Sequence, residues 1–201
     1  MLPDMDGIRI PKPRAPQYLQ VKRMDERFLA VNQETAEAPP LAQVDRIYLL
    51  VWHKGKPVVV RYGEPSAPWE LPVIERAAGA DGERAGKGKA ATPPEALERW
   101  LKQSAKALWG IQIGGWYQHS RLELTASALQ SEVEPGSVRY WVFACATASR
   151  LGEAPAGRDV TRRAMDTRDY ARLLREQYAE FDEILDAAHD GYLIRAARGE
   201  V

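Results

Sequence analysis

The stretch over residues 92–111 constrains the fold of this chain more than any other. It opens with Thr-Pro-Pro-Glu, where Thr92 and Glu95 predict a capping box and the two prolines suit a first helical turn. Gly110 is predicted to end the helix. The residues predicted to form its buried face recur at helical spacing and are Leu97, Trp100, Leu101 and Leu108. We therefore expect a helix over residues 94–109 that packs by one face onto other elements.

Two apolar segments before this helix predict a hairpin. Residues 44–52 are apolar on both faces, which is typical of an interior strand of a covered sheet, and residues 57–62 form the returning strand. Gly55 suits the turn between them. Further strands are predicted over residues 18–22, 28–32, 116–126 and 138–148, with turns at Gly114-Gly115 and Pro135-Gly136. A helix is predicted over residues 167–190, with Gly191 as its break.

The charge and cysteine content of the chain argue against several classes of protein. Lys+Arg and Asp+Glu each total 28 in 201 residues, so no overall field favours nucleic acid or an anionic membrane. Cys145 is the only cysteine, which excludes an internal disulfide and fits a reducing, cytoplasmic compartment. The apolar runs are too short to span a bilayer. We expect an extended, proline-rich arm over residues 1–16 and a single domain over residues 17–201.

The order of these elements, with Trp69-Glu70-Leu71-Pro72 before the helix and Gly110-Ile111 after it, resembles the Nudix hydrolase superfamily. The resemblance covers residues 44–148. It implies an α/β/α sandwich with a mixed sheet, an N-terminal arm and a C-terminal helix. In that family, carboxylates three and four residues apart on the helix hold Mg²⁺ against a diphosphate, which water then attacks.

Most of the family's metal-binding box is replaced in this chain. Counted back from Gly110-Ile111, Glu95 falls on the isolated glutamate of the box and Lys89 on its first glycine. The other box positions hold Gln103 and Ser104 in place of Arg-Glu, and Ala107 and Leu108 in place of the metal-binding Glu-Glu pair. Because neutral groups there cannot hold Mg²⁺, we expect no metal site. If the chain is nevertheless active, Glu95 and Glu98 are the candidate catalytic acids, with Mg²⁺ as cofactor.

Aromatic and basic residues are the candidate ligand-binding groups. The aromatic candidates are Trp52, Trp69, Trp116 and Tyr117. The resemblance implies that they lie near the mouth of a cleft, where aromatic rings can stack a nucleobase, and core packing is the alternative. The basic candidates, within a glycine-rich segment over residues 77–92, are Arg84, Lys87 and Lys89. They can cradle a phosphate, although P-loop spacing is not met, and a flexible solvated loop is the alternative.

These observations predict the fold of the chain, but they leave more than one function open. The first hypothesis is a Nudix-fold protein that has lost the metal-binding glutamates and binds a nucleotide-like ligand or a protein partner without hydrolysing it. One alternative is a Nudix-type hydrolase of nucleoside diphosphate-linked substrates that uses non-standard acids and Mg²⁺. Another alternative is a structural subunit whose arm and C-terminal helix dock onto a larger assembly.

Overall fold

The computed structural model describes residues 17–23, 26–76, 91–125 and 138–200, with side chains from residue 30 onward. The predicted N-terminal arm and the basic candidates Arg84, Lys87 and Lys89 therefore lie outside the described residues. The strands are β1 (Gln17–Arg23), β2 (Glu26–Gln33), β3 (Val44–His53), β4 (Lys56–Tyr62), β5 (Val73–Glu75), β6 (Ile111–Thr125), β7 (Val138–Leu151) and β8 (Val160–Ala164). The helices are α1 (Pro93–Trp109), α2 (Thr167–Gln177) and α3 (Asp182–Ala197), with 3-10 turns η1 (Leu41–Gln43) and η2 (Ala179–Phe181).

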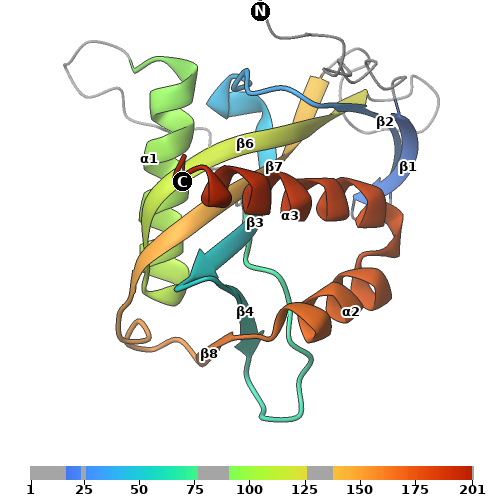
Figure 1. Cartoon of the computed structure of the whole chain (residues 1–201). Helices are drawn as coiled ribbons and strands as arrows, with labels where there is room; N and C mark the ends of the chain where they lie inside the picture. The colour runs from blue at the N-terminus through green and yellow to red at the C-terminus, as the bar shows by residue number, and fades with distance from the viewer. Residues whose placement is uncertain (1–16, 24–25, 77–90, 126–137, 201) are drawn as a thin grey trace, which may run out of the picture.

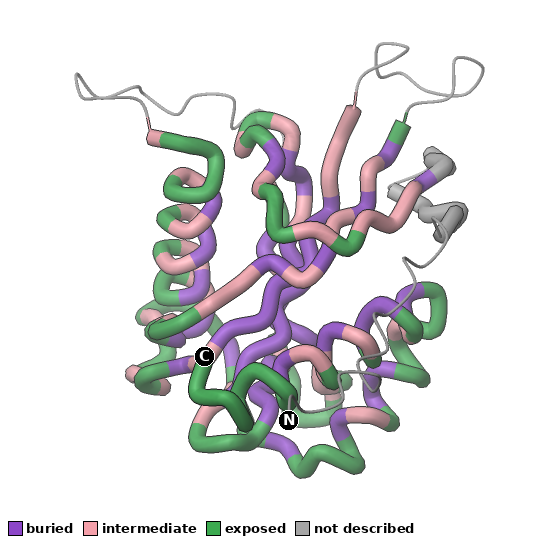
Figure 2. The backbone as a smooth tube through the Cα atoms, turned by 45° about the horizontal axis from the view of Figure 1, so that its top comes forward, coloured by how far each residue is buried: buried purple, intermediate pink, exposed green. Residues whose placement is uncertain are grey.

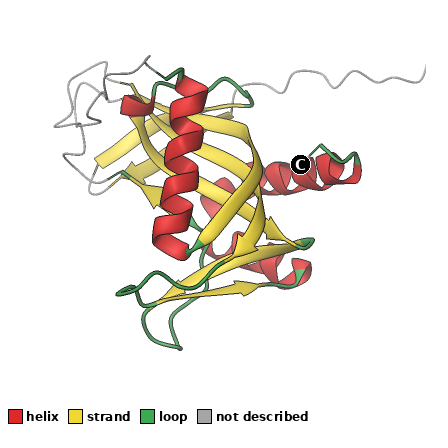
Figure 3. Cartoon of the chain, turned by 90° about the vertical axis from the view of Figure 1, so that its left-hand side faces the viewer, coloured by secondary structure: helices red, strands yellow, loops and turns green. Residues whose placement is uncertain are grey.

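The described strands form one mixed sheet covered by helices on both faces. Its order is β1-β2-β6-β7-β3-β4-β8, and β5 pairs with β3 beside β4. The central pair β3 and β7 is parallel, whereas the other pairs are antiparallel. Helix α1 covers one face, and α2 and α3 cover the other (Figures 1 and 3). This arrangement confirms the predicted α/β/α sandwich. Among the described helices, none is long and apolar enough to cross a membrane.

Strand β3 shows why the centre of the sheet reads as a continuous apolar run. Leu49 and Val51 belong to the core under α1, while Leu50 and Trp52 belong to the core under α2 and α3. Because successive side chains in a strand point to opposite faces, burial on both faces demands apolar residues at every position. Figure 2 shows this buried centre. The predicted hairpin of β3 and β4 is confirmed.

Helix α1 begins and ends as predicted, but it presents a different face to the sheet. The backbone N–H of Thr92 donates to the Glu95 carboxylate at 2.9 Å, and the backbone N–H of Glu95 donates to the Thr92 side chain, so the predicted capping box is confirmed. The buried residues are Leu97, Leu101, Ala105 and Trp109. The prediction is confirmed for Leu97 and Leu101, whereas Trp100 and Leu108 are only partly buried and pack against the edge of the core. The helix carries apolar side chains on two adjacent faces, so its packing against the sheet decides which of these faces is buried.

Two predicted breaks in the chain were also wrong. Gly114-Gly115 is not a turn, because β6 runs unbroken through both glycines and absorbs them as a register shift between Ile113 and Trp116. The C-terminal helix breaks at Tyr178 rather than at Gly191, and α3 continues through the glycine. The hydroxyl of Tyr178 accepts a hydrogen bond from the Leu71 N–H at 3.1 Å. This contact ties the break between α2 and α3 to the sheet.

The core under α2 and α3 is largely aromatic. Tyr48 stacks on Phe143 with ring centroids 5.0 Å apart, and Trp52 stacks on Tyr192 with centroids 3.6 Å apart. Cys145 is fully buried in β7 and donates a hydrogen bond to the Ala188 carbonyl at 3.4 Å. Burial raises the pKa of its thiol to about 12. The thiol is therefore structural, as predicted.

His189 gives this core a dependence on pH. It lies half-buried on α3 beside the rings of Trp52 and Tyr170, with centroids 5.7 and 5.9 Å away. Burial lowers the pKa of its imidazole, and Asp190 and Asp186 offset only part of that effect. The unfolded chain therefore takes up this proton first as the pH falls through about 6.5, so stability is full above that pH and declines below it. In urea titrations at about pH 7.5 and pH 5, we expect His189→Gln to lose less stability than the parent chain. An equal loss in both proteins would assign the effect to other groups.

Candidate functional site

The sheet opens beside β3, and this opening positions a cleft. Strand β3 pairs with β4 only over Val51–His53 and with β5 over Arg46–Tyr48. Where β4 has diverged, Val60 and Glu70 exchange two backbone hydrogen bonds of 2.8 and 3.0 Å. A cavity of about 370 Å³ lies where the end of β4, the segment over residues 70–75 and the C-terminal end of α1 meet. Its lining residues are Tyr62, Glu70, Leu71, Val73, Glu75, Leu108 and Arg158.

The cleft has an apolar floor and a polar rim. Leu71 is buried, and Val73 and Leu108 are partly buried. The rim groups are Tyr62, Glu70, Glu75 and Arg158. An apolar floor with a few polar groups above it is the usual form of a site for a small organic molecule.

Hydrogen bonds hold the walls of the cleft in place. The indole N–H of Trp109 donates to the Tyr62 hydroxyl at 2.6 Å, which fixes that ring against α1. Burial raises the pKa of Tyr62, so its hydroxyl stays protonated at neutral pH. On the opposite wall, the Leu49 N–H donates to the Pro72 carbonyl at 2.9 Å. The cleft is therefore largely preformed.

Carboxylates outnumber cations on the rim. Glu75 forms an ion pair with Arg46 at 2.5 Å, and Arg46 also stacks over the Trp141 ring at 4.8 Å. Among the lining residues, Glu70 is a second carboxylate and Arg158 is the one cation. Carboxylates accept N–H groups and repel phosphates. The rim therefore suits amino groups or ring N–H groups better than a free diphosphate.

The positions of the metal-binding box offer no carboxylate to this cleft. Leu108 lines it, and Ala107 is exposed. Glu95 accepts a hydrogen bond from the N-terminal turn of α1, which lowers the pKa of its carboxyl. Glu98 pairs with Lys102 at 2.6 Å, and that bond lowers its pKa. At 1.5 Å of rise per residue, Glu98 lies about 15 Å and Glu95 about 20 Å along the helix from Leu108.

A metal ion fits the cleft poorly. Glu70 and Glu75 are the carboxylates that line it, and Glu75 is already paired with Arg46. Within the described residues, there is no group of three or more His, Cys, Asp or Glu side chains that could hold a metal ion. Mg²⁺ needs several oxygen ligands in near-octahedral geometry, which two carboxylates beside arginines do not supply.

The resemblance implied that the aromatic candidates lie near the mouth of one cleft. The structure does not bring them together there. Trp52 is fully buried and stacked on Tyr192, so it cannot stack a nucleobase. Trp69 packs against the guanidinium groups of Arg61 and Arg163, 4.5 and 4.7 Å from its ring centroid. None of the aromatic candidates lines the cleft.

Trp116 and Tyr117 point to opposite faces of the sheet because they are neighbours in β6. Trp116 packs on the core under α1, and Tyr117 packs on the core under α2 and α3.

The sequence did not identify three polar residues that line the cleft, which are Tyr62, Glu70 and Arg158. Glu70 is the variable residue of Trp69-Glu70-Leu71-Pro72, and only the folded structure shows that it lines the cleft.

Comparison with known proteins leaves the family open. No family model and no curated protein matches the sequence. Among solved structures, a mutant of the Bacillus subtilis pyrophosphohydrolase BsRppH is similar over 86% of this chain and 96% of that one, with 9% sequence identity and a TM-score of 0.47. At this score and identity, the likeness assigns neither a family nor an activity to this chain.

Proposed function

We propose that this chain binds a small nucleotide-like molecule in the cleft between β4, β5 and α1 without hydrolysing it. The supporting observation is the position of Leu108. The resemblance to Nudix hydrolases places a metal-binding glutamate at this residue, and here its apolar side chain lines the cleft. The Nudix fold supplies the scaffold in this proposal, while the chemistry of the cleft is that of recognition.

The lining of the cleft indicates which part of the ligand it takes. Leu71, Val73 and Leu108 offer an apolar surface for a planar ring. Glu70 can accept the amino or ring N–H groups that nucleobases carry on their edges. Arg158 supplies one positive charge for one anionic group. A nucleobase with a single phosphate or carboxylate matches these groups better than a diphosphate does.

The hydrolase alternative has one observation in its favour, which is that Glu70 and Glu75 line the same cleft. Two carboxylates are the start of a Mg²⁺ site. In that case Glu70 would be the more available ligand, because Glu75 is paired with Arg46. Removing one carboxylate would then abolish turnover.

The two functions are separated by one experiment with a catalytic arm and a binding arm. The catalytic arm measures pyrophosphate or phosphate release from nucleoside triphosphates, dinucleoside polyphosphates, ADP-ribose and NADH with Mg²⁺ and with Mn²⁺. We expect no turnover above the protein-free control. Turnover of about 1 per second or more, abolished by Glu70→Gln, Glu95→Gln or Glu98→Gln, would establish the hydrolase instead.

The binding arm uses two neighbouring substitutions on α1. A panel of nucleosides and nucleotides is titrated by calorimetry, and Leu108→Glu is compared with Ala107→Glu. Leu108→Glu places a charge on the apolar floor, so we expect it to weaken binding by about tenfold or more. Ala107 is exposed and does not line the cleft, so Ala107→Glu should bind like the parent chain. If no member of the panel binds, a protein partner or a structural role replaces this proposal.

A further inference from the structure

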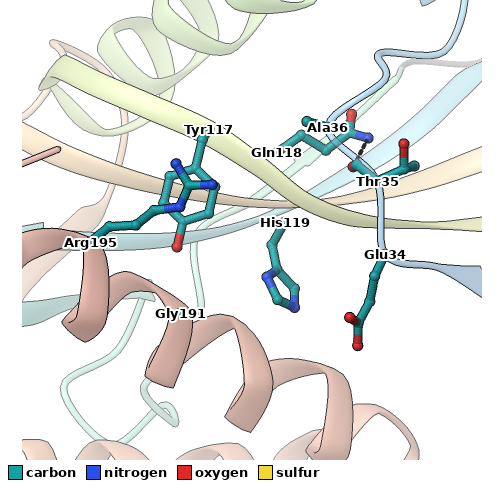
Figure 4. A pocket seen from close by; sticks show the side chains of 8 residues that line it. All are labelled: Glu34, Thr35, Ala36, Tyr117, Gln118, His119, Gly191 and Arg195. Atoms are coloured by element: carbon teal, nitrogen blue, oxygen red, sulfur yellow. Dashed lines mark hydrogen bonds between the residues drawn. The ribbon is translucent and has the colours of Figure 1, made fainter. Parts of the chain in front are cut away.

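A second cavity, of about 220 Å³, lies between α3 and β6, and its polar side chains already have partners (Figure 4). Gln118 donates to the Thr35 carbonyl at 2.8 Å. The Arg195 guanidinium stacks over the Tyr117 ring, 4.3 Å from its centroid, and pairs with Glu200 at 4.0 Å. Polar groups that are open to a partner lie instead at the edge of the sheet formed by β8.

Strand β8 is the last strand of the sheet on the side of β4 (Figure 1). Its hydrogen bonds to β4 involve every second residue, as is usual in an antiparallel pair. At one end Gly63 donates to the Asp159 carbonyl at 3.0 Å, and at the other Met165 donates to the Pro57 carbonyl at 2.7 Å. The odd-numbered residues of this segment therefore direct their backbone groups toward β4.

The other residues of β8 offer their backbone groups to solvent. Val160, Arg162 and Ala164 direct their N–H and C=O groups away from β4. No hydrogen bond from the part of the chain that the structure describes reaches these groups. A row of unpaired backbone donors and acceptors is a template for another strand.

The two arginines of β8 do not cover this edge. Arg162 donates from Nη1 to the Trp109 carbonyl at 2.6 Å, at the end of α1. On the opposite face of the sheet, the Arg163 guanidinium lies 4.7 Å from the centroid of the Trp69 ring. Both guanidinium groups are therefore held over the sheet, inward of β8, and the backbone of the edge stays accessible.

The same arginines give the edge a positive charge on each face of the sheet. Arg162 and Arg163 point to opposite faces because they are neighbours in a strand, and β8 contains no acidic residue. Among the described side chains, neither arginine forms an ion pair with a carboxylate. The edge therefore suits a strand that carries carboxylates on both of its faces.

A second copy of this chain is a poor partner for the edge. If two β8 strands paired in antiparallel fashion over their whole length, the two Arg162 side chains would lie directly opposite each other. Like charges in that position destabilise a strand pair. Positive charges on an edge strand thus oppose self-association, while they attract an acidic strand.

We propose that the outer edge of β8 binds an extended acidic segment of another protein as an added strand. The backbone groups of Val160, Arg162 and Ala164 pair with the backbone of that segment, and consecutive acidic residues reach Arg162 and Arg163 on the two faces. In this mode of recognition, main-chain hydrogen bonds supply affinity and the alternating side chains supply specificity. The proposal goes beyond the nucleotide cleft, because no residue of β8 lines that cleft.

The test titrates the isotope-labelled full chain with a capped peptide of sequence Thr-Val-Glu-Glu-Val-Thr and follows the backbone amides by NMR. We expect saturable shifts centred on the amides of Val160, Arg162 and Ala164, and slower hydrogen exchange at these amides. No saturation at millimolar peptide, or shifts centred on another part of the chain, would overturn the proposal.

Two control peptides separate strand addition from simple charge attraction. In the first, two lysines replace the two glutamates, which sets like charges opposite Arg162 and Arg163. In the second, the two glutamates are N-methylated, so the peptide keeps its charges but loses backbone donors. We expect each control to bind about tenfold more weakly or worse. Equal affinity of the N-methylated peptide would mean that no strand is added and would contradict the proposal.

Variants of the chain test the same two contributions. Ala164→Pro removes one outward N–H group and no bond to β4, and proline is tolerated on an edge strand in that orientation, so affinity should fall by about tenfold while the fold is kept. Arg163→Glu should weaken the glutamate peptide by about threefold or more and strengthen the lysine peptide. Arg198→Gln is the control, because it removes a positive charge from the end of α3, outside β8.

The outcomes of the variants are decisive once each is shown to be folded by circular dichroism and thermal denaturation. Unchanged affinity in Ala164→Pro would place the peptide away from the edge and overturn the proposal. The absence of a reciprocal change in Arg163→Glu would remove the assigned role of charge. A loss in Arg198→Gln as large as that in Arg163→Glu would show attraction to the whole surface and would likewise overturn it.

Discussion

Replacing Trp109 with alanine is expected to lower the free energy of unfolding by about 3–5 kcal/mol. Trp109 has no exposed surface and packs with Leu97, Leu101 and Ala105 against the sheet. The substitution removes the largest side chain of this interface and leaves a cavity that the rigid sheet cannot fill. It also removes the hydrogen bond to Tyr62. Urea denaturation followed by circular dichroism measures the change.

Trp100→Ala is the matched control for this prediction. Trp100 belongs to the same helix but is only partly buried, so its removal should cost about 1 kcal/mol. The comparison tests which face of α1 meets the sheet, because both residues are tryptophans. If the two substitutions cost the same, or Trp100→Ala costs more, the orientation of α1 described here is incorrect.

Gly110→Ala is expected to destabilise the protein by about 3–5 kcal/mol. The residue ends α1 with φ of 65°, a conformation that alanine adopts only with strain. A Cβ atom there would also lie 2.1 Å from the backbone oxygen of Glu153 and 2.9 Å from the Arg162 side chain. Backbone must therefore move to admit one methyl group. The same urea titration measures the loss.

Gly63→Ala separates the two causes of that loss. Gly63 has a similar φ of 68°, but nothing lies within 4 Å of an added Cβ atom. It should cost about 1–2 kcal/mol, from backbone strain alone. The difference between the two variants then measures the close approach of Gly110 to Glu153. Equal costs would show that the chain around residue 153 yields easily.

The sequence determines the local elements of this fold well and their mutual orientation less well. The hairpin of β3 and β4 is predicted by two apolar segments joined by a turn, and the start of α1 is predicted by Thr92 and Glu95. Both are decided by residues that are close in the sequence. By contrast, the sheet buries Trp109 of α1 rather than Trp100. Helical periodicity alone does not decide which of these two residues faces the sheet.

The break between α2 and α3 illustrates the same limit. Gly191 is the obvious helix breaker in the sequence, yet α3 passes through it. The actual break at Tyr178 accompanies a hydrogen bond to Leu71, more than a hundred residues earlier. Likewise, Glu70 and Arg158 come together with Leu108 only through the opening of the sheet. Sites assembled from distant segments leave little signal in a single sequence.

The parallel pairing of β3 with β7 joins two strands that lie far apart in the sequence. Nδ1 of His53 and the Ala148 carbonyl lie 3.0 Å apart although 95 residues separate them in the chain. During synthesis, β3 therefore leaves the ribosome long before its parallel partner β7 exists, and the face of β3 under α2 and α3 stays uncovered until those helices follow. High contact order of this kind slows folding and lengthens exposure to aggregation. We therefore expect a chain that stops short of β7 to aggregate more readily than the whole chain, because the edge and apolar side chains of β3 remain uncovered.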